Sequence, residues 1–257
     1  MGFEISSAGC ESDVDQTFAW IAEHEKTHVV ACANPHSLVV AARDPVFSES
    51  LANADLLLPD GVGVILAARI LGLPIRERVI GYDFFMEFTK RAAKQGGLRY
   101  FFLGSTESAL DLIAGRLKRE FPMMTVCGMY APPFSDNFSA NENDTIIDLI
   151  NHANPDVLWV GMTAPRQEKW IQLHHHRLRV PCIAAVGAVF DFYSGIKKRS
   201  PDFWCRLGLE WLYRLAREPF RLWERSVVSA PLFLLMVLKE FIRWRVLNAV
   251  KQSFRHP

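Results

Sequence analysis

An acid and an arginine stand out because their neighbours suggest a shared ligand. Asp60 follows the short apolar run 56–58 and a proline, and it precedes Gly61. A short apolar run bounded by proline predicts the end of a buried strand. A carboxylate there can take a proton from a hydroxyl as a general base. Arg78, in the segment RVIGYD, has the planar guanidinium that suits phosphate oxygens, so the pair could serve a phosphorylated substrate.

Both residues also have an ordinary structural interpretation. Asp60 could cap the helix that we predict to begin near Val62, a role that is compatible with catalysis. Arg78 could pair with Glu77 or Asp83 at the surface, where ion pairs contribute little to stability. A surface ion pair predicts a mild effect of replacing Arg78, whereas a role in catalysis predicts a severe one.

The elements that must position these residues alternate between strand and helix patterns. Neither GxGxxG nor GxxxxGK[ST] occurs, so the sequence lacks a standard dinucleotide fingerprint and a P-loop. The alternation predicts a Rossmann-like, doubly wound α/β fold with a mostly parallel sheet. We predict strands over 28–33, 56–58, 99–105, 124–130, 156–162 and 182–195, and helices over 14–26, 37–43, 47–53, 62–71, 84–95, 108–121, 144–153 and within 164–178.

Two of the strands end beside small or polar residues. Cys32 and Asn34 lie at the end of the strand 28–33, and Gly104 lies at the end of the strand 99–105. The carboxyl ends of parallel strands border the crevice in which open α/β sheets bind ligands. Glycine lets the backbone approach a ligand closely, so Gly104 and Gly61 are candidate substrate contacts.

The second half of the predicted sheet offers two more candidates. Gln167 in APRQEKWI could contact a nucleotide or a sugar, although its neighbours Arg166 and Glu168 fit a solvated helix start equally well. Asp191, at the end of the predicted strand 182–195, could line the cleft or cap a turn. The histidines 174–176 are consecutive on a predicted helix and point in different directions, which disfavours a metal site.

Composition sets the class of protein. Half of the 257 residues are apolar, enough for one domain with an appendage. The five cysteines are scattered, without a CxxC pair, which fits a reducing cytosol. An apolar body with exposed helices could also support a homo-oligomer.

The C-terminal stretch is basic, whereas the body is acidic. From residue 197 onward, 13 Lys and Arg stand against 5 Asp and Glu. We therefore predict a catalytic domain over 1–200 and a membrane-associating helical appendage over 201–257, because basic and tryptophan-rich segments favour anionic lipid surfaces. The apolar run 227–238 is too short to span a bilayer. An ordinary core helix with a solvated basic face is the alternative.

Arginines of this appendage are further candidates for phosphate contacts. Arg214, Arg217, Arg221 and Arg225 recur at steps of three, four and four, the first three being the candidates, and Pro219 should divide the stretch into two helices. No DxD pair stands at a predicted strand end, so positive side chains rather than a metal are expected to neutralise a diphosphate.

Several sequence blocks together resemble the WecG/TagA/CpsF family of bacterial glycosyltransferases. They occur in family order over roughly residues 28–225, and the ordered set is far more specific than any single block. The blocks are ANPHSLVVAARDP, ADLLLPDGVGV, RVIGYD, FFLGS, GMTAPRQEKWI, VGAVFDFYSG, KRSP and GLEWLYRLAREPFR.

The resemblance implies an inverting transfer of one sugar from a UDP-sugar to a polyprenyl-diphosphate-linked saccharide in exopolysaccharide or cell-surface polysaccharide synthesis. It implies no cofactor, no dedicated metal site and no nucleic-acid partner. It also implies a cytoplasmic enzyme held peripherally on the inner face of the bacterial plasma membrane.

By the same resemblance, Asp60 is the base, Arg78 faces the departing diphosphate, Asn34 contacts substrate and Gln167 contacts the nucleotide sugar. Cys32 stands where the family has threonine, and a thiol is the weaker hydrogen-bonding group.

Two rival functions remain open on the sequence. A non-catalytic protein that binds a nucleotide sugar or lipid diphosphate and recruits other enzymes is compatible with Cys32. A small-molecule oxidoreductase is disfavoured by the missing glycine fingerprint. Binding of UDP without turnover would support the first rival, and binding of a nicotinamide cofactor the second.

Overall fold

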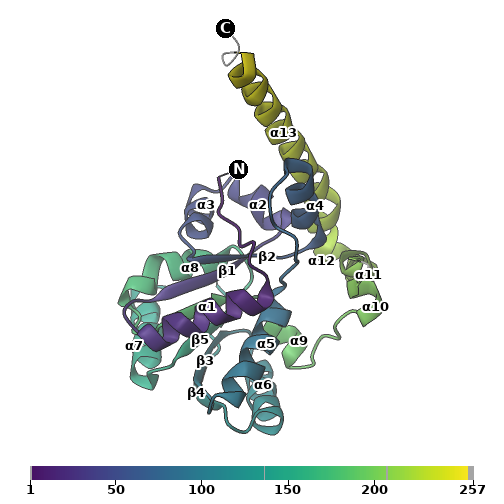
Figure 1. The fold of residues 1–257 in the computed structure, drawn as a ribbon. Helices are drawn as coiled ribbons and strands as arrows, with labels where there is room; N and C mark the ends of the chain where they lie inside the picture. Colours follow the sequence, from purple (N-terminus) through teal and green to yellow (C-terminus); the bar gives the residue numbers. More distant parts are fainter. Residues whose placement is uncertain (1, 136, 207, 254–257) are drawn as a thin grey trace.

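The chain is built around one parallel sheet (Figure 1). The computed structural model describes residues 2–135, 137–206 and 208–253, without the side chains of Asp202, Arg206, Arg221 and 246–253. Within this part the strand order is β2-β1-β6-β5-β3-β4, and every strand pairing is parallel, which confirms the predicted fold class. The strands are β1 (His28–Ala33), β2 (Leu56–Pro59), β3 (Arg99–Gly104), β4 (Thr125–Tyr130), β5 (Val157–Gly161) and β6 (Cys182–Ala185).

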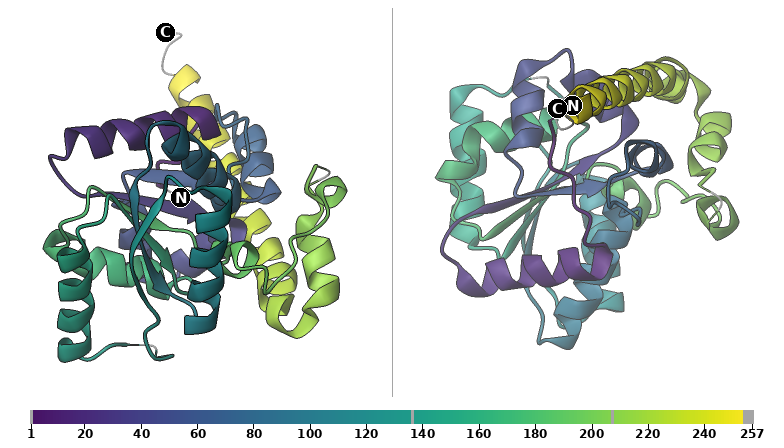
Figure 2. Two further views of the ribbon diagram at one scale, coloured as in Figure 1. Left: turned by 90° about the horizontal axis from the view of Figure 1, so that it is seen from below. Right: turned by 45° about the horizontal axis from the view of Figure 1, so that its top comes forward.

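Helices cover both faces of the sheet, as Figure 2 shows from two further directions. The helices of the body are α1 (Cys10–Glu23), α2 (Pro35–Ala41), α3 (Pro45–Ala52), α4 (Val62–Leu71), α5 (Gly81–Lys94), α6 (Glu107–Glu120), α7 (Ala140–Ala153), α8 (Arg166–His174) with the 3₁₀ turn η1 (His175–Arg177), and α9 (Val189–Tyr193). The α4 bounds match the prediction, because Gly72 adopts the left-handed conformation that ends this helix.

Alternate side chains along each strand enter two separate cores. On β5, Leu158 and Val160 pack with α2, α3, α7 and α8, whereas Val157 and Trp159 pack with α1, α5, α6 and α9. Successive strand residues point to opposite faces. Because both faces are buried, the strands read as continuous apolar runs instead of alternating patterns.

Capping residues explain where several helices begin. The side chain of Ser139 accepts from the amide of Glu142 while the Glu142 carboxylate accepts from the amide of Ser139, so α7 starts at Ala140 and not at the predicted 144. Asn34 and Ser37 form the corresponding box at the start of α2. These reciprocal bonds satisfy amides that the first helical turn leaves without partners.

One predicted strand is too long. β6 ends at Ala185, and Gly187, with φ +53°, turns the chain into the short helix α9. Val189, Phe190 and Tyr193 are buried against the sheet, at a spacing that fits a helix and not a strand. Asp191 therefore lies on a helix and not at a strand end.

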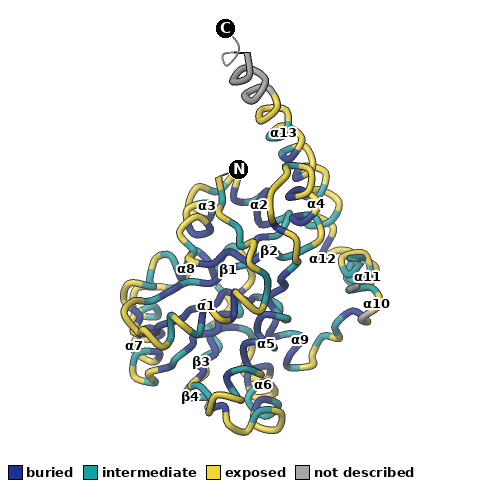
Figure 3. The backbone as a smooth tube through the Cα atoms, in the orientation of Figure 1, coloured by how far each residue is buried: buried dark blue, intermediate teal, exposed yellow. Residues whose placement is uncertain are grey.

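The appendage combines short helices with one long helix. It comprises α10 (Asp202–Arg206), α11 (Glu210–Arg217), α12 (Pro219–Trp223), the π-helical turn η2 (Glu224–Val228) and α13 (Ser229–Ser253). Pro219 opens α12, as predicted. The first turns of α13 pack on α2 and α4, and the helix then extends away from the body (Figures 1 and 3).

The packing of α13 bears on both interpretations of the apolar run 227–238. Phe233 and Val237 are 2 % and 1 % exposed and belong to the core, as a core helix requires. Leu234, Leu235 and Leu238 on the same helix stay exposed. Among the described residues, no helix combines the length and apolarity needed to cross a bilayer. The division at residue 200 stays a prediction.

Candidate active site

A cleft of about 980 Å³ lies at the carboxyl ends of the strands. The segments that follow all six strands form one side, and α11, η2 and the start of α13 form the other. It contains nine of the eleven predicted site residues, namely Cys32, Asn34, Asp60, Gly61, Arg78, Gly104, Gln167, Asp191 and Arg214. The crevice predicted from strand ends is thus present, with the appendage as a second wall.

Asp60 stands directly after β2 and is anchored through its backbone. Its amide donates to the carbonyls of Ala33 at 2.8 Å and Leu58 at 2.9 Å, so the end of β1 fixes its position. Gly61 is the N-cap of α4, and no side chain caps this helix. The capping interpretation of Asp60 is therefore wrong. Its carboxylate makes no hydrogen bond within the described part of the chain and is half-buried in the cleft.

Arg78 reaches across the cleft to the appendage. Its Nη2 donates to the carbonyl of Cys205 at 3.2 Å, and its Nη1 lies 3.7 Å from the carboxylate of Glu210. The alternative pairing with Glu77 or Asp83 is wrong, because Asp83 instead accepts from Arg199 at 2.7 Å. Arg78 is thus a partly buried cation that also holds α10 and α11 beside the site.

The charges around Asp60 work in opposite directions. Burial raises the pKa of Asp60, and the Glu210 carboxylate raises it further. Arg225 lowers the pKa most strongly among the opposing charges, followed by Arg78 and Arg214. The arginines therefore favour the ionised carboxylate that a general base requires, and they surround a space suited to an anionic ligand.

A hydrogen bond joins the appendage to α2, the helix that follows β1. His36 Nδ1 on α2 lies 2.8 Å from the hydroxyl of Ser229, which is buried at the start of α13. Burial lowers the pKa of His36, and Arg225 lowers it further. A neutral imidazole beside Arg225 avoids placing two cations together. This contact fixes η2, and with it Arg225, over the cleft.

Cys32 and Asn34 occupy the end of β1. The pKa of the Cys32 thiol is raised well above its usual value, first by burial and then by the carboxylates of Asp60 and Glu168. It is therefore a neutral thiol in the neighbourhood of two acids. The side-chain oxygen of Asn34 accepts from the amide of Ser37 at 3.0 Å, so this residue caps α2 as well as lining the cleft.

Two predicted glycines occupy backbone positions that other residues rarely adopt. Gly61 has φ +101° and Gly104 has φ +116°. A side chain on Gly104 would also place its Cβ 2.6 Å from the carbonyl oxygen of Gly161 on the neighbouring strand. Glycine is required at both places to bring the backbone to the cleft.

Gln167 and Glu168 lie in the first turn of α8, and both are buried. The Gln167 amide donates to Glu168 Oε1 at 2.8 Å. Burial raises the pKa of Glu168 to about 7, against the lowering effect of this hydrogen bond. The interpretation of Glu168 as part of a solvated helix start is therefore wrong. Arg166 is only partly exposed, and it stacks over the Phe134 ring and donates to the Ser135 carbonyl.

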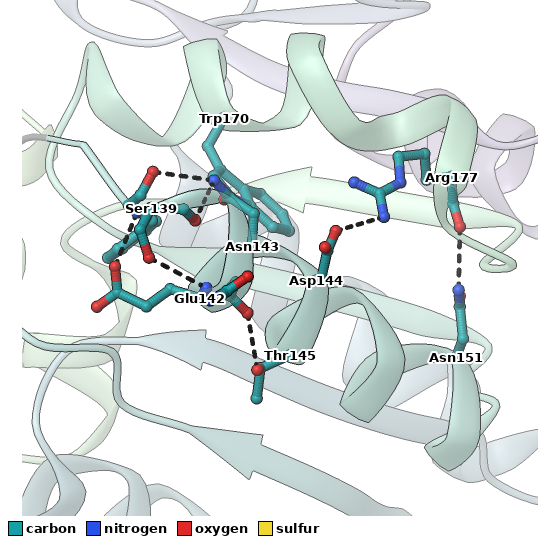
Figure 4. Close-up of polar contacts among 10 residues, drawn as sticks. Ser139, Glu142, Asn143, Asp144, Thr145, Asn151, Trp170 and Arg177 are labelled. Atoms are coloured by element: carbon teal, nitrogen blue, oxygen red, sulfur yellow. Dashed lines mark hydrogen bonds and ion pairs between the residues drawn. The ribbon is translucent and has the colours of Figure 1, made fainter.

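The position of α8 is fixed by α7, as Figure 4 shows. The indole of Trp170 donates to Asn143 Oδ1 at 2.8 Å, and Asn151 donates to the carbonyl of Arg177 at 3.0 Å. Arg177 in turn pairs with Asp144 at 2.7 Å. These bonds at Trp170 of α8 and at Arg177 of η1, with the packing of α8 on α3, restrain the turn that carries Gln167 and Glu168.

The remaining predicted residues differ in their relation to the cleft. Asp191 lines it but is paired with Lys197 at 2.6 Å. Arg214 lines it and stacks over the Phe192 ring. Arg217 is exposed and stacks over Tyr213, outside the cleft lining. The side chain of Arg221 lies outside the described residues. The arginines predicted to share one helical face therefore differ, because Arg214 lines the cleft and Arg217 does not.

Sequence reasoning missed several charged residues of the cleft. Arg225 belongs to the arginine series predicted for the appendage but is not among the predicted site residues, and it acts on Asp60 more strongly than Arg78 does. That spacing was a usable signal. Glu168 and Glu210 carried none, because an acid in the first turn of a helix is ordinarily solvated.

Comparison with known proteins settles the family. The model of the glycosyl transferase WecG/TagA/CpsF family matches residues 1–246. The chain belongs to this family. It is 33 % identical over 217 residues to an N-acetylglucosaminyldiphosphoundecaprenol N-acetyl-beta-D-mannosaminyltransferase of Bacillus spizizenii, covering 84 % of this chain and 81 % of the relative. Relatives with the same name occur in Bacillus subtilis, at 32 % identity over 82 % of this chain and 79 % of the relative, and in Staphylococcus aureus strain MW2, at 26 % over the same shares.

For a glycosyltransferase of the WecG/TagA/CpsF family, the cleft offers the two chemical functions that glycosyl transfer requires. A carboxylate can accept the proton of an attacking hydroxyl, and arginines can stabilise charge that develops on a leaving group. Asp60 and the cations Arg78, Arg214 and Arg225 share one cavity for these tasks.

Proposed function

We propose that this glycosyltransferase moves a hexose from a UDP-sugar to a saccharide linked to polyprenyl diphosphate, with inversion at the anomeric carbon. Support for the acceptor comes from the relatives, whose name specifies a diphosphoundecaprenol-linked N-acetylglucosamine. The observation that carries the proposal is the placement of Asp60 in one cleft with three arginines, which together can hold a diphosphate beside a base.

In the proposed reaction, Asp60 takes the proton from an acceptor hydroxyl. The oxygen freed of its proton attacks the anomeric carbon of the donor sugar, and the bond between that carbon and the diphosphate oxygen breaks. UDP leaves with the bonding electron pair. Because attack and departure occur on opposite faces, the configuration inverts. A positioned base typically contributes about 10² to 10⁴ in rate.

The leaving diphosphate requires positive charge from the protein under this proposal. Arg225 and Arg214 come from the appendage, and Arg78 joins the appendage to the body. The guanidinium group suits bidentate binding of phosphate oxygens. Stabilisation of charge that develops in the transition state is usually a large part of the catalytic effect. We therefore propose a reaction that proceeds without a metal or other cofactor.

We further propose that the enzyme works at the inner face of the plasma membrane. The acceptor named for the relatives carries a lipid, and α13 exposes Ile242 and Trp244 next to Arg243 and Arg245. Basic residues next to exposed tryptophan favour an interfacial position on anionic lipid. The appendage forms one wall of the cleft and also carries this surface, so lipid binding would bring the acceptor toward Asp60.

The test is an assay with purified full-length protein. UDP-N-acetylmannosamine and other UDP-hexoses serve as donors, and N-acetylglucosamine on a short polyprenyl diphosphate serves as acceptor. We expect transfer by the wild type and a loss of about 10² or more in kcat for Asp60→Asn, which keeps the side-chain shape. Glu25→Gln, at an exposed loop position, is the matched control. Near wild-type turnover of Asp60→Asn would refute the base, and UDP binding without turnover would favour a binding protein.

A further inference from the structure

Two buried acceptor oxygens in the cleft have no partner among the described residues. They are Oε1 of Gln167 and Oε2 of Glu168, whose residues are 3 % and 5 % exposed. Leaving a buried polar atom unpaired costs about 1–3 kcal/mol, and more for a charged group. Since both residues line the cleft, a ligand can supply the missing donors.

The orientation of the pair follows from their mutual hydrogen bond. A carboxylate can only accept, so the Gln167 amide must turn its Nε2–H toward Glu168 Oε1. Oε1 of Gln167 then faces away from that bond. Gly187 borders the amide, and even a Cβ there would lie 3.6 Å from Nε2. The same Cβ would lie 3.7 Å from Oε1, so Gly187 places no side chain against this side of the amide.

We propose that Gln167 Oε1 and Glu168 Oε2 form a two-acceptor subsite that binds two hydroxyl groups of the transferred hexose, an inference that rests on the proposed function. The subsite would make Glu168 a specificity-determining residue. A sugar that lacks one of the two hydroxyls leaves a buried acceptor unpaired, and such sites discriminate strongly against the incomplete ligand.

The chemistry of the ligand excludes the uracil ring as the occupant. The hydrogen-bonding edge of uracil has a single N–H between two carbonyl oxygens, so it cannot satisfy two acceptors, and its carbonyls would face a carboxylate. Two hydroxyl groups can donate to both oxygens. The hexose and the ribose of the nucleotide both carry such pairs, and the position of the subsite decides between them.

Position favours the hexose. Cys32, Asp60 and Glu168 line the same cleft, and both carboxylates act on the thiol of Cys32, so the two acids lie near this one residue. Asp60 must reach the hydroxyl that attacks the anomeric carbon, and the sugar that contains this carbon lies next to it. The ribose is separated from the same carbon by the diphosphate. The raised pKa of Glu168 also fits a carboxylate whose hydrogen-bond partners arrive with the ligand.

Glu168 also borders a second cavity of about 410 Å³, whose polar and apolar lining includes His175 and His176. If Oε2 faced only that cavity, Glu168 would have no influence on donor binding. A binding experiment tells whether Oε2 of Glu168 faces the cleft or the second cavity.

The experiment compares binding of UDP and UDP-N-acetylmannosamine by calorimetry to full-length wild type, Glu168→Gln and the control Glu25→Gln. In Glu168→Gln, we expect affinity for the UDP-sugar to fall roughly 10-fold to 100-fold, while affinity for UDP stays the same. Equal losses for both ligands would place the ribose at the subsite, and no loss would place Oε2 elsewhere. Either result overturns the inference while leaving the proposed function intact. Failure of the wild type to bind UDP-sugar would overturn both.

A second measurement needs no variant and therefore does not depend on folding of Glu168→Gln. The wild type is titrated with 3-, 4- and 6-deoxyfluoro analogues of the UDP-sugar, because fluorine cannot donate a hydrogen bond. We expect two of the three analogues to bind at least about tenfold more weakly. Equal affinity for all three would contradict the subsite.

Discussion

Asp60 lies among charges that come largely from a distant part of the sequence. Arg225, Arg214 and Glu210 belong to the appendage, and Arg78 contacts it. The residue that we propose as the base therefore depends on the appendage for its protonation state. Because a base must be ionised to accept a proton, this dependence should be visible in the pH profile of the reaction.

Removing the strongest of the opposing cations tests this dependence. Arg225 stabilises the ionised form of Asp60, so Arg225→Gln should raise the pKa of Asp60. The acid limb of the kcat/KM profile reports the base of the free enzyme. We expect this limb to move to higher pH in Arg225→Gln, in addition to any loss of rate from weaker diphosphate binding. The measurement is kcat/KM between about pH 4 and 9.

Glu210 provides the matched variant with the opposite sign. Its carboxylate raises the pKa of Asp60, so Glu210→Gln should move the same limb to lower pH. If the acid limb shifted in the same direction in both variants, or in neither, Asp60 would not be the group that the pH profile reports.

At the level of elements, the sequence was sufficient for most of the sheet. The apolar runs that became β1 to β5 are short and bounded by glycine, proline or asparagine, so their type and position could be predicted. The segment VFDFY was misread because its apolar residues follow a strand without a clear break. Only the positive φ of Gly187 turns it into α9, and a single glycine in an apolar run does not reveal its φ.

Predicting the site from the sequence succeeded for residues at strand ends and failed for those brought in by tertiary packing. Asp60 and Gly104 could be placed because the carboxyl ends of parallel strands meet at one edge. The burial of Glu168 follows from the packing of α8 on α3 and β6, and the position of Arg225 follows from the path of the appendage. The burial of Glu168 leaves no pattern in the local sequence, and the spacing of Arg225 indicates its helical face but not that this face meets the cleft.

The helix α4 exposes an apolar stripe beside the cleft. Val62, Leu66 and Ile70 of α4, and Leu73 just after it, are all exposed, and the first two also line the cleft. Leu234 of α13 lines the same cleft. Apolar residues next to a cluster of arginines match a ligand with an anionic head and an apolar chain. We expect the polyprenyl chain to leave the cleft along this stripe.

Leu66→Gln tests the stripe. We expect it to raise KM for an acceptor with a long polyprenyl chain several-fold, because contact with apolar surface contributes about 25 cal/mol per Å². KM for the UDP-sugar and for a short-chain acceptor should stay close to the wild type. Leu112→Gln, at a similarly exposed leucine on α6, is the control. A similar change for both chain lengths would rule out an exit path for the lipid.

At the scale of the whole molecule, the near and far ends of the appendage have different surroundings. Its near end completes the cleft and the core, through Leu222, Phe233 and Val237. Its far end extends from the body with exposed Ile242 and Trp244 (Figure 3). Because the start of α13 is buried and its end is exposed, removing the entire appendage and removing only its end are different experiments.

Truncation after residue 205 should destabilise the protein as well as detach it from lipid. Each buried apolar side chain that is lost removes roughly 1.5–3 kcal/mol, and the total approaches the stability of a typical domain. Truncation after residue 240 keeps Phe233 and Val237 and removes the exposed end. We expect this shorter truncation to melt within a few degrees of the full-length protein but to bind anionic vesicles more weakly in a flotation assay. Since basic residues are removed, the difference should shrink in neutral vesicles and at high salt. Unchanged vesicle binding after truncation at residue 240 would move the membrane contact to the near part of the appendage.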